Sequence, residues 1–103
     1  RGTRFLHVMA PCPTGWGHAT DVTADIAKEA VDCGLWYLAE FEGSQVSGVP
    51  GGAFKLNRNP KEFGDAEHYL RGQKRFKHMG GDDVARAIVG RDAKWEFIRS
   101  HWT

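Results

Sequence analysis

The chain opens with an almost wholly apolar run, residues 5–10, whose alternating side chains point to opposite faces of an extended backbone. Both of these faces are largely apolar, a pattern typical of a parallel strand that helices cover on both sides. Pro11 ends the run, because proline has no N–H to donate to a neighbouring strand. The pattern therefore predicts a buried strand over residues 5–10.

Helical periodicity follows this strand. Apolar residues recur at helical spacing over residues 22–31, behind the helix-capping residues Thr20 and Asp21, and Gly34 is placed to end the helix. Residues 35–41 then alternate like a second buried strand. Together these segments predict a strand–helix–strand unit with parallel strands and a right-handed crossover.

The second half of the chain is predicted to contain one short strand and two helices. A Gly-rich stretch, residues 43–52, indicates a surface loop, and residues 53–56 indicate a short edge strand. The next helix is expected over residues 65–76, with its first residue, an aspartate, as the cap. An apolar face over residues 84–102 predicts a last helix, in which Gly90 leaves open a bend between two shorter helices.

Charge and composition exclude several classes of protein. The 14 basic and 13 acidic residues leave a net charge of +1 and are well mixed, so neither nucleic acid nor an anionic membrane is an expected partner. No apolar run approaches membrane-spanning length and no signal peptide is recognisable, so a cytoplasmic protein is expected. Because the chain starts at Arg1 and runs almost directly into a strand, residues 1–103 are expected to form a single segment, a fragment of a larger unit.

The main candidate for chemistry is Cys12, which stands between Pro11 and Pro13 at the carboxyl end of the first predicted strand. In open α/β sheets this edge is where cofactors bind. The alternative is a small buried hydrophobic residue, which is the interpretation for Cys33. A disulfide between the two is disfavoured by a reducing cytosol. An iron–sulfur cluster held by four thiolates needs more cysteines than this chain has, so it would share ligands with other polypeptide.

The remaining candidates carry weaker signals. The glycines of residues 15–17 are interpreted as turn formers, and Trp16 between them either shields the nearby thiol from water or simply packs. A zinc site made by His7, His18 and the cysteine between them matches no closed pattern and lacks a fourth ligand. The basic residues within 74–78 are either a solvated helix end or a docking site for another subunit or an acidic electron acceptor.

The run His-Val-Met-Ala-Pro-Cys-Pro-Thr-Gly-Trp, residues 7–16, resembles the β subunit of thiamin-diphosphate-dependent 2-oxoacid:ferredoxin oxidoreductases of the pyruvate:ferredoxin type. The resemblance continues through residues 26–31, 33–40 and 66–79, and it covers the C-terminal third of that subunit. It implies the C-terminal portion of an α/β, doubly wound thiamin-diphosphate-binding domain, with a mainly parallel sheet covered by helices.

For the site, the resemblance implies that Cys12 supplies the fourth thiolate of the [4Fe–4S] cluster nearest the thiamin. The family's other three cluster ligands are absent from this chain, as is its motif for thiamin diphosphate and Mg²⁺. The resemblance therefore implies that thiamin diphosphate and Mg²⁺ are bound mainly by residues outside this chain, and that no catalytic residue lies within it.

For function, the resemblance implies part of an enzyme that oxidatively decarboxylates a 2-oxoacid such as pyruvate with coenzyme A and passes the electrons to ferredoxin. The implied partners are the rest of the β subunit and the other oxidoreductase subunits, and the chain is not expected to be active alone. Two alternatives stay open at this point. One is an arylglyoxylate or indolepyruvate oxidoreductase of the same superfamily, and the other is an α/β interaction module without a redox role.

Overall fold

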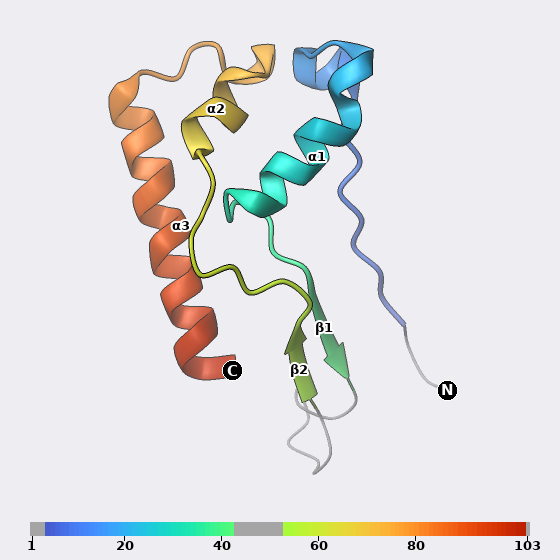
Figure 1. Ribbon diagram of the computed structural model, residues 1–103, viewed down its shortest axis with the longest axis vertical. Coiled ribbons are helices and arrows are strands. Elements are labelled where there is room, and N and C mark those ends of the chain that lie inside the picture. Colours follow the sequence, from blue (N-terminus) through green and yellow to red (C-terminus); the bar gives the residue numbers. More distant parts are fainter. Residues whose placement is uncertain (1–3, 43–52, 103) are drawn as a thin grey trace.

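The computed structural model describes residues 4–42 and 53–102, and the predicted loop over residues 43–52 lies outside this range. α1 and α2 lie beside one end of the long helix α3, and the strands β1 and β2 lie toward the other end (Figure 1). In chain order the elements are η1 (Pro13–Gly17), η2 (Thr20–Val22), α1 (Thr23–Asp32), β1 (Ala39–Glu42), β2 (Ala53–Leu56), α2 (Ala66–Arg71), η3 (Lys74–Phe76) and α3 (Gly81–Trp102).

The helix α1 forms where the periodicity predicted it. Ile26 and Ala30, one turn apart, are its buried residues. The short turn η2 precedes the helix, so Val22 stands at its N-cap in place of Thr20 or Asp21. Gly34 follows the C-terminal end with a φ of +80°, a conformation that favours glycine, which confirms its predicted role in ending the helix.

The sheet differs from the prediction in direction. β1 and β2 pair antiparallel, with Ala39 opposite Leu56 and Phe41 opposite Phe54. The short strand expected over residues 53–56 is confirmed. The parallel pairing predicted between residues 5–10 and 35–41 is wrong, because β1 pairs with β2, the strand that follows it in the chain. The burial expected for β1 is also wrong at its far end, where Phe41 is 53% exposed.

The first predicted strand is not formed. Residues 5–10 are extended but belong to no strand, and they run outside the two-stranded sheet (Figure 1). Phe5, Leu6 and Val8 are 88%, 85% and 67% exposed. A strand requires a hydrogen-bonding neighbour, and the two strands among the described residues pair with each other. The predicted parallel strand–helix–strand unit is therefore absent from the described part of the chain.

The helix predicted next is interrupted after the six residues of α2. The Asp65 carboxylate accepts a hydrogen bond of 3.1 Å from the backbone N–H of His68, which confirms the predicted cap of α2. Gln73 then adopts an extended conformation, and its side chain donates a hydrogen bond back to the carbonyl of Tyr69. The chain then resumes a short helical turn as η3, so the predicted single helix is two separate helical segments.

The last helix, α3, is continuous through Gly90, so the open question of a bend is settled in favour of one helix. At its start, the Asp83 carboxylate accepts a hydrogen bond of 2.9 Å from the backbone N–H of Gly80. This hydrogen bond, together with the nearby Arg86 guanidinium, lowers the pKa of Asp83. No helix among the described residues has both the length and the apolar character needed to cross a membrane.

The core lies between the three α-helices. Its residues are mostly contributed by the helices' facing sides, with Trp95 and Ile98 of α3 each only 2% exposed. The described residues thus form a mixed α/β unit with a helical core and a small antiparallel sheet. The continuous cluster of buried residues consists of Ile26, Ala30, Cys33, Ala66, Tyr69, Leu70 and Val84.

Candidate functional site

Cys12 lies where the extended N-terminal segment ends and the turn η1 begins, and its thiol is exposed and free. Its Sγ atom accepts a hydrogen bond of 3.3 Å from the backbone N–H of Gly15. Its carbonyl oxygen accepts a second, of 2.8 Å, from the backbone N–H of Trp16. The turn therefore folds back on Cys12, the residue at its N-cap. One hydrogen bond to the carbonyl oxygen and one to the sulfur hold this residue at the surface.

The turn η1 lies directly against η3. Gly17, the last residue of η1, has a φ of +75°, and a Cβ atom built on it would lie only 2.5 Å from the Cβ of Lys74. Glycine therefore meets two demands at this position, a left-handed backbone and a close approach to a neighbouring segment. The prediction that the glycines of this loop form its turn is confirmed.

Trp16 is half-buried and packs against the helical core, which agrees with the packing alternative weighed from the sequence. The Arg75 guanidinium lies over the Trp16 ring, with its central carbon 3.6 Å from the ring centre. The sequence placed Arg75 only within a general basic cluster. Its contact with a side chain from the cysteine turn appears first in the structure, because the two residues are far apart in the chain.

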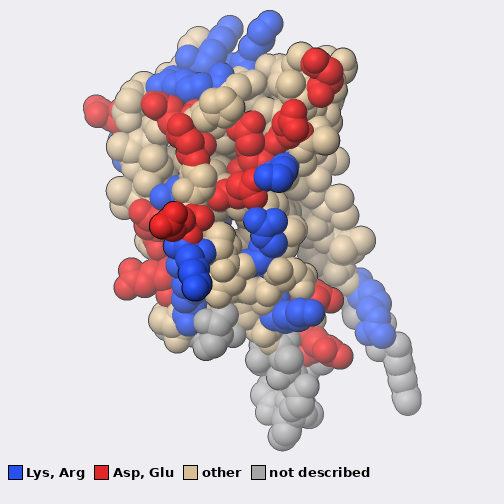
Figure 2. Space-filling model, in the orientation of Figure 1, with Lys and Arg blue, Asp and Glu red and all other residues tan. Residues whose placement is uncertain are grey.

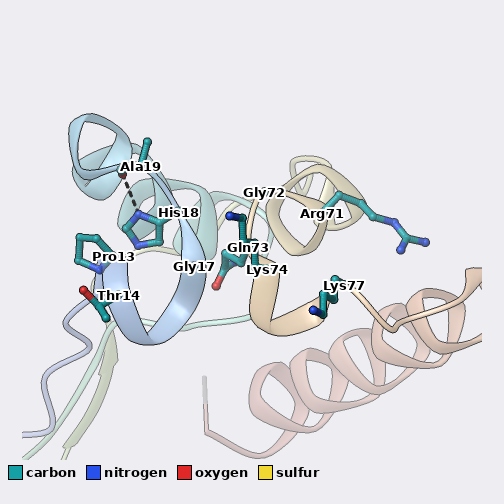
Figure 3. A pocket seen from close by; sticks show the side chains of 10 residues that line it. All are labelled: Pro13, Thr14, Gly17, His18, Ala19, Arg71, Gly72, Gln73, Lys74 and Lys77. Carbon is teal, nitrogen blue, oxygen red and sulfur yellow. Dashed lines mark hydrogen bonds between the residues drawn. The ribbon is translucent and has the colours of Figure 1, made fainter.

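A pocket of about 830 Å³ opens between η1 and the α2–η3 segment (Figure 3). Three of its lining residues are basic and no carboxylate lines it, so the pocket favours an anionic group. Figure 2 shows basic side chains gathered at this end of the molecule. The lining residues are Pro13, Thr14, Gly17, His18, Ala19, Arg71, Gly72, Gln73, Lys74 and Lys77.

Cys33 has the opposite environment to Cys12. It is 1% exposed, and its thiol donates a weak hydrogen bond of 3.7 Å to the carbonyl of Ala30. Burial raises the pKa of the Cys33 thiol, because the thiolate would lose its hydration. The interpretation of Cys33 as a small core residue is confirmed, and both cysteines are free thiols.

The two histidines near Cys12 do not join it in a metal site. His7 is exposed and lies edge-on to Trp36, with ring centres 4.8 Å apart. The Nδ1 atom of His18 lies 2.9 Å from the carbonyl oxygen of Ala19. Among the described residues, no three cysteine, histidine or acidic side chains gather in a cluster suited to a metal ion.

The arrangement leaves Cys12 as the group with the chemistry to bind a soft metal. Its sulfur is exposed and fixed, whereas the Cys33 sulfur is enclosed in the core. A single thiolate can occupy one corner of an iron–sulfur cluster, and such clusters take four protein ligands. One exposed thiol is compatible with a cluster whose other ligands come from other polypeptide.

Comparison with known proteins supports the resemblance noted in the sequence, although no protein-family model matches the chain. Pyruvate synthase subunit PorB of Methanosarcina barkeri is 41% identical over 91 residues, 84% of this chain and 28% of that subunit. PorB of Methanocaldococcus jannaschii is 33% identical over 97 residues, 94% of this chain and 30% of the subunit. Ketoisovalerate oxidoreductase subunit VorB of Pyrococcus horikoshii is 40% identical over 100 residues, 95% of this chain and 30% of the subunit.

This chain thus spans a little under a third of the length of the relatives that it matches. The matches extend over most of the chain and include subunits named for two different substrates. The chain therefore belongs to the family of oxidoreductase subunits that contains pyruvate synthase PorB and ketoisovalerate oxidoreductase VorB, and corresponds to the C-terminal part of these subunits.

Proposed function

We propose that the chain is part of a 2-oxoacid:ferredoxin oxidoreductase, which oxidatively decarboxylates a 2-oxoacid such as pyruvate with coenzyme A and passes the electrons to ferredoxin. The observation that carries this proposal is the 41% identity over 91 residues to a pyruvate synthase subunit. Relatives named for ketoisovalerate match at 40%, so pyruvate is the leading member of a class of substrates. The proposed location of the enzyme is the cytoplasm, whose reducing conditions keep cysteines such as these two as free thiols.

Within this enzyme, Cys12 is the proposed ligand of a [4Fe–4S] cluster. The exposed thiol and the N–H···S hydrogen bond from Gly15 suit this role, because hydrogen bonds to cluster sulfurs adjust the reduction potential. When bound, the cluster carries single electrons away from the reaction. This chain holds the sulfur at the surface through the Gly15 N–H, and the remaining ligands come from polypeptide outside this chain.

Thiamin diphosphate and Mg²⁺ are bound mainly by residues outside this chain, so we assign no catalytic residue within it. The basic pocket beside η1 contains no carboxylate, and Mg²⁺ prefers oxygen ligands such as carboxylates. A thiamin cofactor supplies the carbanion chemistry of such an enzyme. The contribution of this chain is thus to electron transfer and to assembly with the rest of the subunit.

The exposed N-terminal segment supports the assembly proposal. Phe5, Leu6 and Val8 leave an extended apolar surface in contact with water, which is unfavourable by about 25 cal/mol for each Å² of apolar area. We propose that residues 5–10 form a strand within a doubly wound, mainly parallel sheet that the rest of the subunit provides. Covered on both faces there, the segment would bury the side chains that its pattern predicts to be buried.

The test replaces Cys12 with alanine in the assembled oxidoreductase, and Cys33→Ala serves as the matched control. Cys12→Ala is expected to lose about four iron atoms per subunit, together with the electron paramagnetic resonance signal of one cluster. Cys33→Ala is expected to retain both, because its sulfur is enclosed in the core. Unchanged iron content in Cys12→Ala would exclude the ligand role.

A further inference from the structure

The side chain of Gln73 is a buried polar group that connects two segments. It is 1% exposed, and its Nε2 atom donates a hydrogen bond of 2.8 Å to the carbonyl of Tyr69 in α2. Its Oε1 atom accepts a hydrogen bond of 2.8 Å from the Nε atom of Arg75 in η3. Because a buried amide with both ends bonded has one favourable orientation, Gln73 fixes the direction in which the Arg75 side chain leaves η3.

Held in this way, the Arg75 guanidinium lies over two aromatic rings. Its central carbon is 3.6 Å from the ring centre of Trp16 and 4.4 Å from that of Phe76. A guanidinium stacks favourably on an aromatic face, both as a planar group and as a cation. Arg75 therefore attaches the turn η1 to η3 through the side chain of Trp16.

Trp16 in turn holds Cys12. The backbone N–H of Trp16 donates a hydrogen bond of 2.8 Å to the carbonyl of Cys12. The N–H of the preceding Gly15 donates one of 3.3 Å to the sulfur itself. A displacement of the tryptophan would move both of these donors. A continuous series of contacts thus runs from the buried Gln73 through Arg75 and Trp16 to the Cys12 sulfur.

We infer that Arg75, oriented by Gln73, is a positioning residue for the Cys12 thiolate, an inference that rests on the proposed cluster-ligand role of Cys12. The sequence offered a solvated helix end as the plain explanation of the basic cluster. Lys77 of the same cluster fits that explanation, since it has no ring or ion-pair contact with any residue in the described ranges. Arg75 differs from it in the buried amide and the two rings that hold it.

The contacts determine the direction of the expected effects. Releasing Trp16 weakens the N–H···S hydrogen bond from Gly15, and losing such a bond lowers the reduction potential of an iron–sulfur cluster because the more negative reduced form is less stabilised. Removing the Arg75 charge acts in the same direction. Gln73→Leu separates the two causes, because it keeps the positive charge of Arg75 and removes the group that orients it.

The experiment uses the assembled oxidoreductase with Arg75→Met, Arg75→Lys and Gln73→Leu, and Lys77→Met as the matched control for charge. The midpoint potential of the cluster is measured by redox titration with electron paramagnetic resonance, and the rate of iron loss is measured with a chelator. We expect a lower potential in Arg75→Met. We also expect about two- to fivefold faster iron loss, which is the factor by which losing one exposed cation–π contact should increase opening of the turn η1. Gln73→Leu should shift both in the same direction, and Arg75→Lys should recover part of each.

Two outcomes would overturn the inference. If Arg75→Met and Lys77→Met give the same potential and the same rate of iron loss, the stack has no special effect and the basic cluster acts only as solvated charge. If Arg75→Lys is as affected as Arg75→Met while Gln73→Leu is unchanged, the buried amide does not orient the guanidinium. Failure of the ligand role itself is distinguished by Cys12→Ala, which would then keep its cluster.

Discussion

The indole N–H of Trp95 donates a hydrogen bond of 2.8 Å to the carbonyl oxygen of Gly34, joining α3 to the turn that ends α1. Gly34 lies just beyond the C-cap of α1 and is buried, so its carbonyl has no partner within the helix and is satisfied by a side chain from another element. The carbonyls on either side also accept hydrogen bonds from side chains of α3. Arg91 donates one of 3.1 Å to the carbonyl of Cys33, and Lys94 donates one of 3.3 Å to that of Leu35.

We predict that Trp95→Phe lowers the free energy of unfolding by about 1–3 kcal/mol, because the buried Gly34 carbonyl loses its donor. Trp95→Ala should cost more, about 3–5 kcal/mol, since it also leaves a cavity in the core. Urea denaturation followed by circular dichroism measures both. Val89→Ala on an exposed face of α3 is the control, expected within about 0.5 kcal/mol of the parent. Equal stability of Trp95→Phe and the parent would show that water replaces the indole donor.

Replacing either of two glycines with alanine is predicted to change the stability of the protein, in opposite directions. Gly34 has a φ of +80°, and a Cβ atom there would lie 2.7 Å from ring carbons of Phe63, so Gly34→Ala should destabilise the protein by more than about 1 kcal/mol. Gly90 lies within α3 with nothing within 4 Å of the new atom, so Gly90→Ala should stabilise by about 0.5–1 kcal/mol. Thermal denaturation of the two variants tests the pair. Destabilisation by Gly90→Ala would mean that its face of α3 is covered in the assembled protein.

The ion pair between His68 and Glu29 predicts a pH dependence. Their Nδ1 and Oε2 atoms are 2.9 Å apart, and the hydrogen bond that the imidazole donates to the carboxylate raises the pKa of His68. A folded-state pKa above the unfolded value means that the stabilisation is fully present below the unfolded pKa, and is lost as the pH rises through the folded one. The pair should therefore stabilise the protein more at about pH 5.5 than at about pH 8.

The measurement compares Glu29→Gln with the parent by urea denaturation at both pH values, and by NMR titration of His68. We expect the variant to lose stability at the lower pH and little at the higher one, and we expect the pKa of His68 to fall. Glu67→Gln is the control, since Glu67 also precedes His68 in sequence yet pairs with Arg71 instead. An equal loss at both pH values would show that Glu29 acts through packing alone.

The sequence by itself determined the features that depend on near neighbours in the chain. The spacing of Ile26 and Ala30, the cap at Asp65 and the glycine at position 34 each predicted an element or an end correctly. The place of Cys33 in the last turn of the predicted helix, and the tendency of free cysteines to be buried, likewise predicted its burial. Helical periodicity, caps and turns act over a few residues, so the sequence alone contains the interactions that decide them.

Tertiary structure decided whatever needs a partner from far along the chain. The run at residues 5–10 has the pattern of a strand, but a strand forms only beside another, and the second strand pairs instead with residues 53–56. The stack of Arg75 on Trp16 likewise joins residues that no local rule connects. The sequence identified Cys12 as the residue to examine, and the fold alone shows what surrounds its sulfur, because that environment is assembled from segments separated by about sixty residues.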